Sequence, residues 1–91
     1  MGYTIYYRTS IKKWMEFSRF IKRICAGIGW DVRIAEERAV IEPPCDFTEK
    51  MVIEKEGEGF VKTNLVEPCH SICLLLLHAA ASFGSVSVWE D

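Results

Sequence analysis

The chain has 91 residues, of which 49% are hydrophobic and 26% are charged. This length suits one small domain, and this apolar fraction excludes an intrinsically disordered segment. The formal net charge of −2 excludes both a histone-like polycation and a polyacidic tail. We therefore expect residues 1–91 to form a single domain.

The start of the sequence predicts no targeting segment. Arg8, Lys12 and Lys13 interrupt the apolar run that a secretory signal requires, and Tyr6 stands where N-myristoylation requires serine or threonine. The longest apolar run, residues 72–77, is well short of the roughly 18 residues that indicate a membrane span. We therefore expect a cytoplasmic protein that does not contact a membrane.

In chain order, the first predicted element is a strand, because residues 3–8 are β-branched and aromatic. Apolar residues then recur at steps of three and four from Trp14 to Cys25, which predicts an amphipathic helix. Glycines just after this stripe end the helix, since glycine adopts the left-handed conformation cheaply. Two short strands are predicted at residues 30–34 and 39–42, and a pair of prolines ends the second one.

The second half of the chain begins with a predicted hairpin. Residues 51–55 and 60–63 are strand-like and flank the segment Glu-Gly-Glu-Gly, which is typical of a turn. A second helix is predicted from Pro68 to about Ser82, because proline suits the first helical position and the run that follows is apolar. Residues 85–89 form the last predicted strand.

The predicted order β-α-β-β-β-β-α-β becomes the β-α-β-β-α-β order of a ferredoxin-like fold when the extra hairpin in the middle is set aside. We therefore expect an α+β sandwich, a split β-α-β arrangement with two helices on one face of an antiparallel sheet. Alternation assigns six side chains to the inner face: Ile5, Val32, Ile34, Val61, Val86 and Val88. It assigns six others to the open outer face: Tyr6, Arg8, Arg33, Phe60, Lys62 and Trp89.

This outer face combines aromatic and basic side chains, which bind single-stranded nucleic acid by stacking on bases and neutralising phosphates. Residues 57–61 resemble the signature of the RNA-recognition-motif family in two glycines, a phenylalanine and a valine. Tyr6 resembles the aromatic residue of that family's first strand, and the resemblance implies RNA binding. Glu56, Glu58 and Thr63 depart from the signature. The alternative is that these aromatic side chains cover a dimer interface or pack on the hairpin.

The predicted second helix is apolar nearly all round, which is typical of a helix covered on more than one side. One face is expected to pack on the sheet: Ile72, Cys73, Leu75, Leu76, Ala79, Ala80 and Phe83. Leu74 and Leu77 then lie on a second face that one small sheet cannot cover. We expect these two leucines to form the interface of a homo-oligomer, with burial under the middle hairpin as the alternative.

The four cysteines are Cys25, Cys45, Cys69 and Cys73. Without a secretion signal, buried free thiols are expected, although the absence of glutamine and the single asparagine are typical of hyperthermophiles, whose intracellular proteins do contain disulfides. Cys69 lies in the first turn of the second helix, where the helix dipole favours the thiolate, so it is the candidate reactive thiol. The cysteine spacing lacks the second pair of a zinc site, and no metal or other cofactor is expected.

Charge is distributed unevenly along the chain. Residues 1–23 carry six basic side chains and one acidic one, whereas residues 24–91 carry five and twelve. A basic helix face of this kind binds nucleic acid or an acidic partner, or stays solvated. We expect a non-catalytic interaction module that self-associates. Two alternatives stay open: a single-stranded nucleic-acid (RNA) binder that uses the outer sheet face, and a small thiol-dependent enzyme centred on Cys69.

Overall fold

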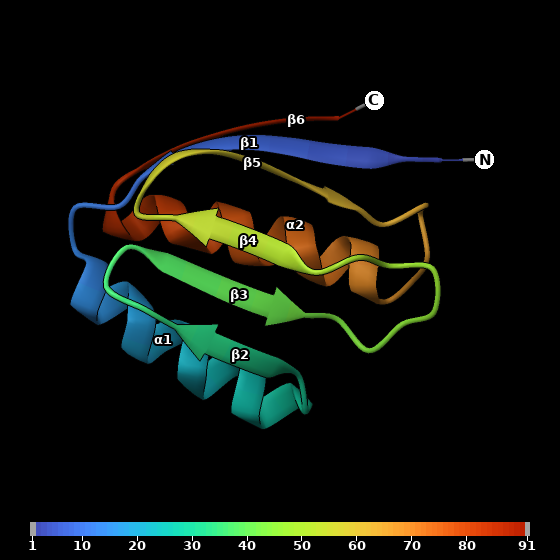
Figure 1. The fold of residues 1–91 in the computed structure, drawn as a ribbon, viewed down its shortest axis with the longest axis horizontal. Coiled ribbons are helices and arrows are strands. Elements are labelled where there is room, and N and C mark those ends of the chain that lie inside the picture. The colour runs from blue at the N-terminus through green and yellow to red at the C-terminus, as the bar shows by residue number, and fades with distance from the viewer. Residues whose placement is uncertain (1, 91) are drawn as a thin grey trace.

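The computed structural model describes residues 2–90, which contain six strands and two α-helices. In chain order the elements are β1 (Thr4–Ser10), α1 (Trp14–Ile28), β2 (Asp31–Ile34), β3 (Arg38–Glu42), β4 (Met51–Glu54), β5 (Glu56–Lys62), α2 (Cys69–Ala80), the short 3-10 helix η1 (Ala81–Phe83) and β6 (Ser85–Glu90). The predicted α+β class is confirmed, and so is the order of strands and helices (Figure 1).

The strands form two antiparallel sheets, with the orders β5-β1-β6 and β2-β3-β4. In the first sheet β1 is central, and Tyr6 pairs with Phe60 of β5 on one side and with Trp89 of β6 on the other. In Figure 1, α1 lies behind β2, and α2 lies behind β4 and below β1, β5 and β6, so both helices are on the same side of the strands. Contacts of α1 with β2 and of α2 with β6 hold this layer in place.

The predicted single sheet is divided between β4 and β5, which are edge strands of different sheets. The Tyr7 side chain occupies the space between them. Its hydroxyl donates a hydrogen bond to the carbonyl oxygen of Val52 in β4 (2.7 Å) and lies 3.4 Å from the carbonyl oxygen of Phe60 in β5. The Tyr7 side chain thus lies where backbone hydrogen bonds between β4 and β5 would otherwise join the two sheets.

The predicted turn at Glu-Gly-Glu-Gly is wrong, because the chain reverses at Lys55 and the four residues belong to β5. Gly59 is needed there for space rather than for a turn. A Cβ on Gly59 would lie 2.9 Å from the Tyr7 ring and 2.9 Å from the carbonyl oxygen of Val52. The glycine therefore allows the tyrosine ring to cross over β5 and reach β4.

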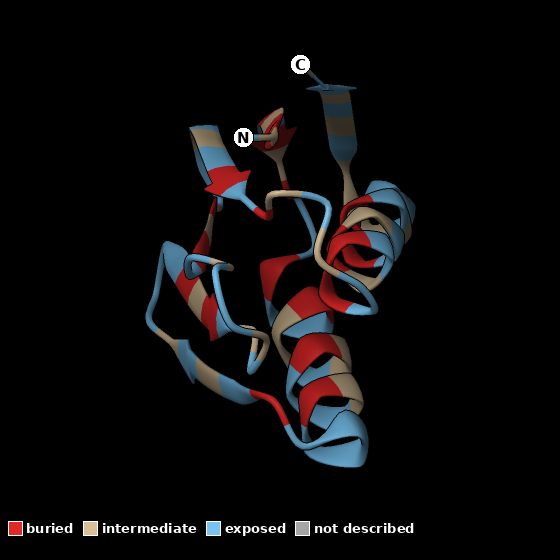
Figure 2. Ribbon diagram, turned by 90° about the vertical axis from the view of Figure 1, so that its right-hand side faces the viewer, coloured by how far each residue is buried: buried red, intermediate tan, exposed pale blue. Residues whose placement is uncertain are grey.

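The core lies between the strands and the helices, and buried residues face this interior in Figure 2. Of the six predicted inner side chains, Ile5 and Val61 are fully buried. The other four are partly buried and pack against the core: Val32, Ile34, Val86 and Val88. The buried stripe of α1 also follows the predicted spacing, and Gly29 ends the helix in the left-handed conformation (φ 78°).

The second helix is buried along one stripe and not on two faces. Its buried residues are Cys69, His70, Cys73, Leu76, Leu77 and Ala80. Leu77 is fully buried in the core and Leu74 is partly buried against it, whereas Leu75 is 65% exposed. Leu77 is therefore buried within one chain and cannot contribute to the predicted oligomer interface, whereas Leu74 keeps part of its surface exposed and stays a prediction. The buried stripe begins at Cys69, and the burial of this first residue fixes which face of the helix turns to the core.

Within residues 2–90, no helix is long and apolar enough to cross a membrane.

Candidate functional site

Three aromatic side chains lie next to one another across the outer face of the β5-β1-β6 sheet. This aromatic row consists of Phe60, Tyr6 and Trp89, one from each strand. The Tyr6 ring centre is 6.4 Å from that of Phe60 and 6.2 Å from that of Trp89, and the planes of the latter pair differ by only 12°. Phe60 is 56% exposed and Trp89 is 47% exposed, so the row presents ring surface to solvent.

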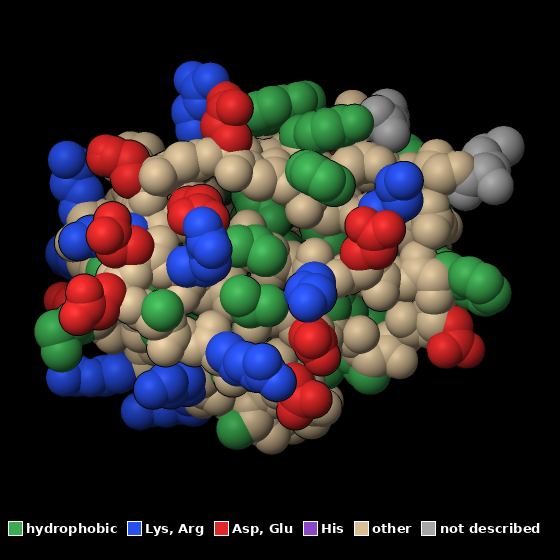
Figure 3. All heavy atoms as spheres, viewed as in Figure 1, with side chains coloured by type: hydrophobic (Ala, Val, Ile, Leu, Met, Phe, Trp, Pro, Cys, Tyr) green, Lys and Arg blue, Asp and Glu red, His purple; other side chains and the backbone are tan. Residues whose placement is uncertain are grey.

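The row forms because its three residues occupy directly paired positions on neighbouring strands. Side chains at paired positions share one face of a sheet and come within contact distance. The alternation pattern therefore predicted their common face correctly. Figure 3 shows hydrophobic side chains gathered over this sheet at the top of the view, with charged side chains on both sides of them.

The predicted basic residues divide into three different environments. Arg8 pairs with Glu58 on the same face, and its Nε donates to the Glu58 carboxylate at 2.9 Å. Arg33 does not join the row, because it lies on β2 in the other sheet. Lys62 is exposed and follows Phe60 by two positions on β5, so it borders the row. The row thus has one neutralised cation on one side and one lysine on the other.

A groove of about 550 Å³ runs between β4 and β5 beside the row. Val52, Gly59 and Phe60 form its apolar part, and three carboxylates with one lysine line the rest: Glu49, Lys50, Glu54 and Glu58. Arg38 Nε donates to the Glu54 carboxylate at 2.8 Å, and Arg8 neutralises Glu58. The border of the row at Phe60 is therefore close to neutral and offers a polyanion no excess of positive charge along this side.

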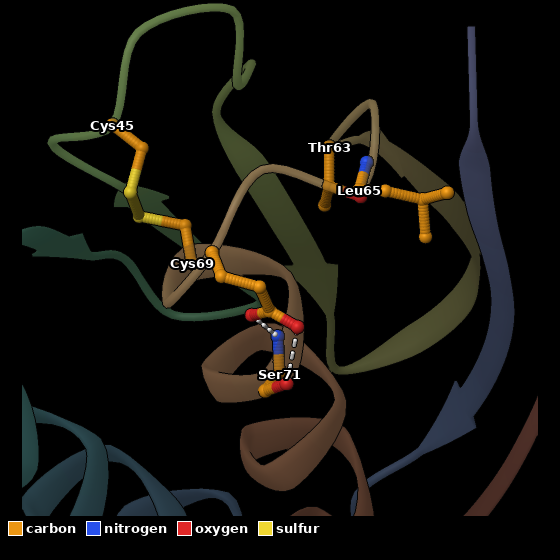
Figure 4. Close-up of a disulfide and its surroundings, with 6 residues drawn as sticks. Cys45, Thr63, Leu65, Cys69 and Ser71 are labelled. Atoms are coloured by element: carbon orange, nitrogen blue, oxygen red, sulfur yellow. Dashed lines mark hydrogen bonds between the residues drawn. A yellow bond between two sulfur atoms is a disulfide. The ribbon is translucent and has the colours of Figure 1, made fainter.

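The candidate reactive thiol, Cys69, forms a disulfide with Cys45 (Figure 4). The bond joins the loop after β3 to the first residue of α2, and the two Cα atoms are 6.2 Å apart. Cys69 therefore has no free thiol to act as a nucleophile while the bond is intact. The expectation of four free thiols is wrong for this pair, because the fold brings together two residues that are 24 positions apart.

The two remaining cysteines, Cys25 and Cys73, are free and buried. Burial raises the pKa of the Cys73 thiol to about 12, and it also raises the pKa of Cys25. Both thiols therefore stay protonated at neutral pH, which makes them weak nucleophiles. Neither one provides the activated sulfur that a thiol-dependent enzyme needs.

We expect a thiol reagent at pH 8 to label none of the cysteines rapidly in the native, unreduced protein. After denaturation without a reductant it should label two thiols, Cys25 and Cys73, and after denaturation with a reductant it should label four. Mass spectrometry of the labelled protein counts the adducts. Four adducts without a reductant would show that the disulfide is absent.

A buried polar cluster around His70 was not predicted from the sequence. His70 Nδ1 lies 2.7 Å from the Thr63 hydroxyl, and His70 Nε2 lies 3.5 Å from a Glu90 carboxylate oxygen that also accepts a hydrogen bond from the Tyr3 hydroxyl. A hydroxyl, an imidazole and a carboxylate in contact with one another are also the three groups of a catalytic triad. However, the Thr63 side chain is fully buried and also accepts a hydrogen bond from the Leu65 backbone N–H. A substrate cannot reach it, so the cluster joins the ends of β1, β5, α2 and β6.

The chain matches no protein family, no curated protein sequence and no solved structure. We therefore infer the function of the chain from the geometry of the aromatic row and its surroundings.

Proposed function

We propose that the chain is a single-domain, non-catalytic binding module that self-associates through the aromatic row. The observation that carries this proposal is a row of three aromatic side chains on one sheet face, in which the half-buried Tyr6 contacts both the exposed Phe60 and the exposed Trp89. Aromatic side chains supply much of the binding free energy at protein interfaces, because each buries a large apolar area with few rotatable bonds. The partner that we infer is a second copy of the same chain.

The charges around the row support a symmetric pairing of two copies. On β5, Glu58 stands two positions before Phe60 and Lys62 two positions after it, on the same face of the strand. A twofold axis along the row places Lys62 of one copy opposite Glu58 of the other, with the rings packed between them. An interface of this kind is self-complementary, as a twofold dimer requires.

Single-stranded nucleic acid is the second candidate partner for the same surface. The nearly parallel rings of Tyr6 and Trp89 support it, because bases stack on exposed aromatic rings, and Lys62 is placed to contact a phosphate. The groove next to Phe60 carries no excess of positive charge, and Arg8 is paired with Glu58, so both features favour a neutral partner instead. We therefore place nucleic acid second.

Replacing the central residue of the row, Tyr6→Ala, is expected to weaken the dimer by roughly 2 kcal/mol, or about 30-fold in Kd, because interface aromatics of this kind are hot spots. Light scattering at micromolar concentrations should report a mass above 10.4 kDa for the unmodified chain and a lower average mass for the variant. The matched control is Leu75→Ala, which removes an exposed apolar side chain from α2 and should leave the mass unchanged.

A labelled oligonucleotide of mixed sequence separates the two candidate partners. Self-association through the row predicts no binding at physiological salt. Micromolar binding that is lost in Tyr6→Ala and weakened in Lys62→Ala would instead identify single-stranded nucleic acid as the ligand. A chain that stays monomeric and binds no oligonucleotide would contradict both proposals for this surface.

We also propose a cytoplasmic location in a hyperthermophilic organism. Disulfides are rare in the cytosol of mesophiles but common in that of hyperthermophiles. The Cys45–Cys69 bond and the scarcity of amide side chains, with no glutamine and one asparagine, both agree with this origin.

We further propose that the two sheets are one ferredoxin-like sheet that is divided along the β4–β5 boundary. Past this boundary, the Glu49 backbone N–H donates to the Lys62 carbonyl oxygen at 3.0 Å, so the chain segments run side by side there. The continuous order would then be β2-β3-β4-β5-β1-β6. If the β2-β3 hairpin at one edge is removed from this order, the remaining strands β4-β5-β1-β6 have the ferredoxin-like arrangement.

A further inference from the structure

Two large apolar side chains are held in solvent by backbone conformations that disfavour them. Phe47 in the loop after β3 is 81% exposed and has a φ of 63°, and Leu65 in the loop before α2 is 52% exposed and has a φ of 59°. Positive φ is rare for bulky residues, because the side chain crowds the neighbouring carbonyl oxygen. Such strain persists only where the surrounding structure enforces it, and it is concentrated at functional sites.

Three connections between the two loops enforce this geometry. The Asn64 side chain donates to the Phe47 carbonyl oxygen at 2.7 Å and accepts a hydrogen bond from the Tyr3 backbone N–H at 3.1 Å. The Glu49–Lys62 backbone hydrogen bond and the disulfide join the same two loops. In Figure 4 the Leu65 side chain points away from the disulfide. Phe47 and Leu65, which we name the apolar tip, are therefore presented on a rigid frame.

A groove of about 450 Å³ lies between the first half of α1 and the turn that joins β2 to β3. Its volume is within the usual range of about 300–1,000 Å³ for binding pockets. Met15, which is 67% exposed, contributes apolar surface together with Trp14 and Ile34, and Arg19 and Lys22 add positive charge. Methionine adapts its shape to different partners, which suits it to a docking surface. We name this feature the α1 groove.

The charges of the tip and of the α1 groove are opposite. Asp46 precedes Phe47, and Glu67 follows Leu65 by two positions, whereas the lining of the α1 groove has two basic side chains, Arg19 and Lys22, against one carboxylate, Glu36. Figure 3 shows acidic and hydrophobic side chains at the right-hand edge, and basic side chains gathered at the lower left over α1. The carboxylates of the groove between β4 and β5 are balanced by Lys50 and by the ion pairs with Arg8 and Arg38, so this groove offers the acidic tip no net positive charge.

We propose that the apolar tip of one copy docks into the α1 groove of a second copy. The tip and the groove lie at opposite ends of the molecule in Figure 1, along its 35 Å axis, so one copy cannot satisfy both by itself. The contact joins two different surfaces and leaves one tip and one groove unoccupied at the ends of any assembly that does not close into a ring. Such head-to-tail contacts build rings or open chains. This inference rests on the proposed self-association, but it uses surfaces separate from the aromatic row.

The test mixes two variants, one of which lacks the apolar tip while the other lacks a functional α1 groove. Phe47→Asn removes the tip, and the fold is retained because asparagine tolerates the left-handed conformation. Met15→Glu puts a carboxylate into the α1 groove at a well-exposed position. Both variants also carry Tyr6→Ala, so that the aromatic row does not contribute. Sedimentation velocity then measures the mass of each variant alone and of the equimolar mixture.

The parent Tyr6→Ala protein should show masses above that of one chain, because it keeps both the tip and the groove. Each double variant alone should be monomeric, with Kd raised roughly 30-fold, since an aromatic anchor or its pocket is lost. The mixture should form a heterodimer and nothing larger, because only one tip and one groove remain intact. Ile28→Ser is the matched control, since it removes another exposed apolar residue and should leave association unchanged.

A mixture that stays monomeric would overturn the proposal, and so would a Phe47→Asn variant that associates as strongly as its parent. Failure of the proposed aromatic-row dimer has a different signature. In that case Tyr6→Ala alone would leave the mass of the protein unchanged, while the mixture would still form the heterodimer.

Discussion

Replacement of Gly84 by alanine is expected to cost about 3 kcal/mol or more of the free energy of unfolding, enough to threaten the fold of a domain this small. Gly84 lies where the chain enters β6, directly against the end of β1. A Cβ there would overlap the Ser10 carbonyl oxygen, and it would lie 2.8 Å from Ile11 Cα and 2.9 Å from Lys12 N. All three neighbours are backbone atoms, so no side-chain rotation relieves the clash. Urea denaturation followed by circular dichroism measures the loss.

The matched control is the same substitution at Gly27, near the end of α1. No atom lies within 4 Å of the position where its Cβ would be. Alanine has the higher helix propensity, so Gly27→Ala should stabilise the protein by about 0.5–1 kcal/mol. If Gly84→Ala were as stable as the unmodified protein, the close approach of β6 to residues 10–12 would be incorrect.

Reduction of the disulfide is expected to lower the free energy of unfolding by about 3.5 kcal/mol at 25 °C, the loop-closure entropy for the 24-residue separation of Cys45 and Cys69. The bond acts mainly by limiting the conformations of the unfolded chain. Urea denaturation with and without a reductant measures the difference, and the double variant Cys45→Ser/Cys69→Ser should match the reduced protein.

The reductant should have no further effect on the double variant, because Cys25 and Cys73 are free in the native protein. A reduced protein with the same unfolding midpoint as the oxidised one would show that the two loops are held without the bond. The Asn64 side chain would then be the main connection between them.

The common face of the three aromatic residues was predictable from the sequence because alternation along a strand is local information. Side chains two positions apart share a face of a strand, so alternation alone placed Tyr6, Phe60 and Trp89 on the outer face. Their adjacency in a row depends in addition on the register of three strands that are distant in sequence. The division of the sheet was not predictable in this way. It depends on Tyr7, whose hydroxyl reaches a carbonyl oxygen 45 residues further along the chain. Gly59, which makes room for its ring, belongs to the segment Glu-Gly-Glu-Gly, which resembles a turn when it is read locally.

The face that α2 buries could not be derived from the helix by itself. Four consecutive leucines, residues 74–77, make it apolar on every side, so its own pattern sets no preferred rotation. Its orientation is fixed by Cys69 at its first position, through the packing of that residue and its bond to Cys45. The same dependence on distant residues concealed the cluster around His70, whose partners come from β6 and from the loop before α2.

The position of β1 at the centre of its sheet has a consequence for the folding rate. Its two neighbours are β5 and β6, so every backbone ladder that it forms closes a loop of more than 40 residues. Contacts that are so distant in sequence must overcome the entropy of loop closure before they stabilise the chain, which slows folding. On the ribosome, β1 has no strand partner until β5 has been made, and its second edge stays open until β6 follows. Throughout that interval the nascent chain exposes an apolar, unpaired strand, which is the species most prone to aggregation.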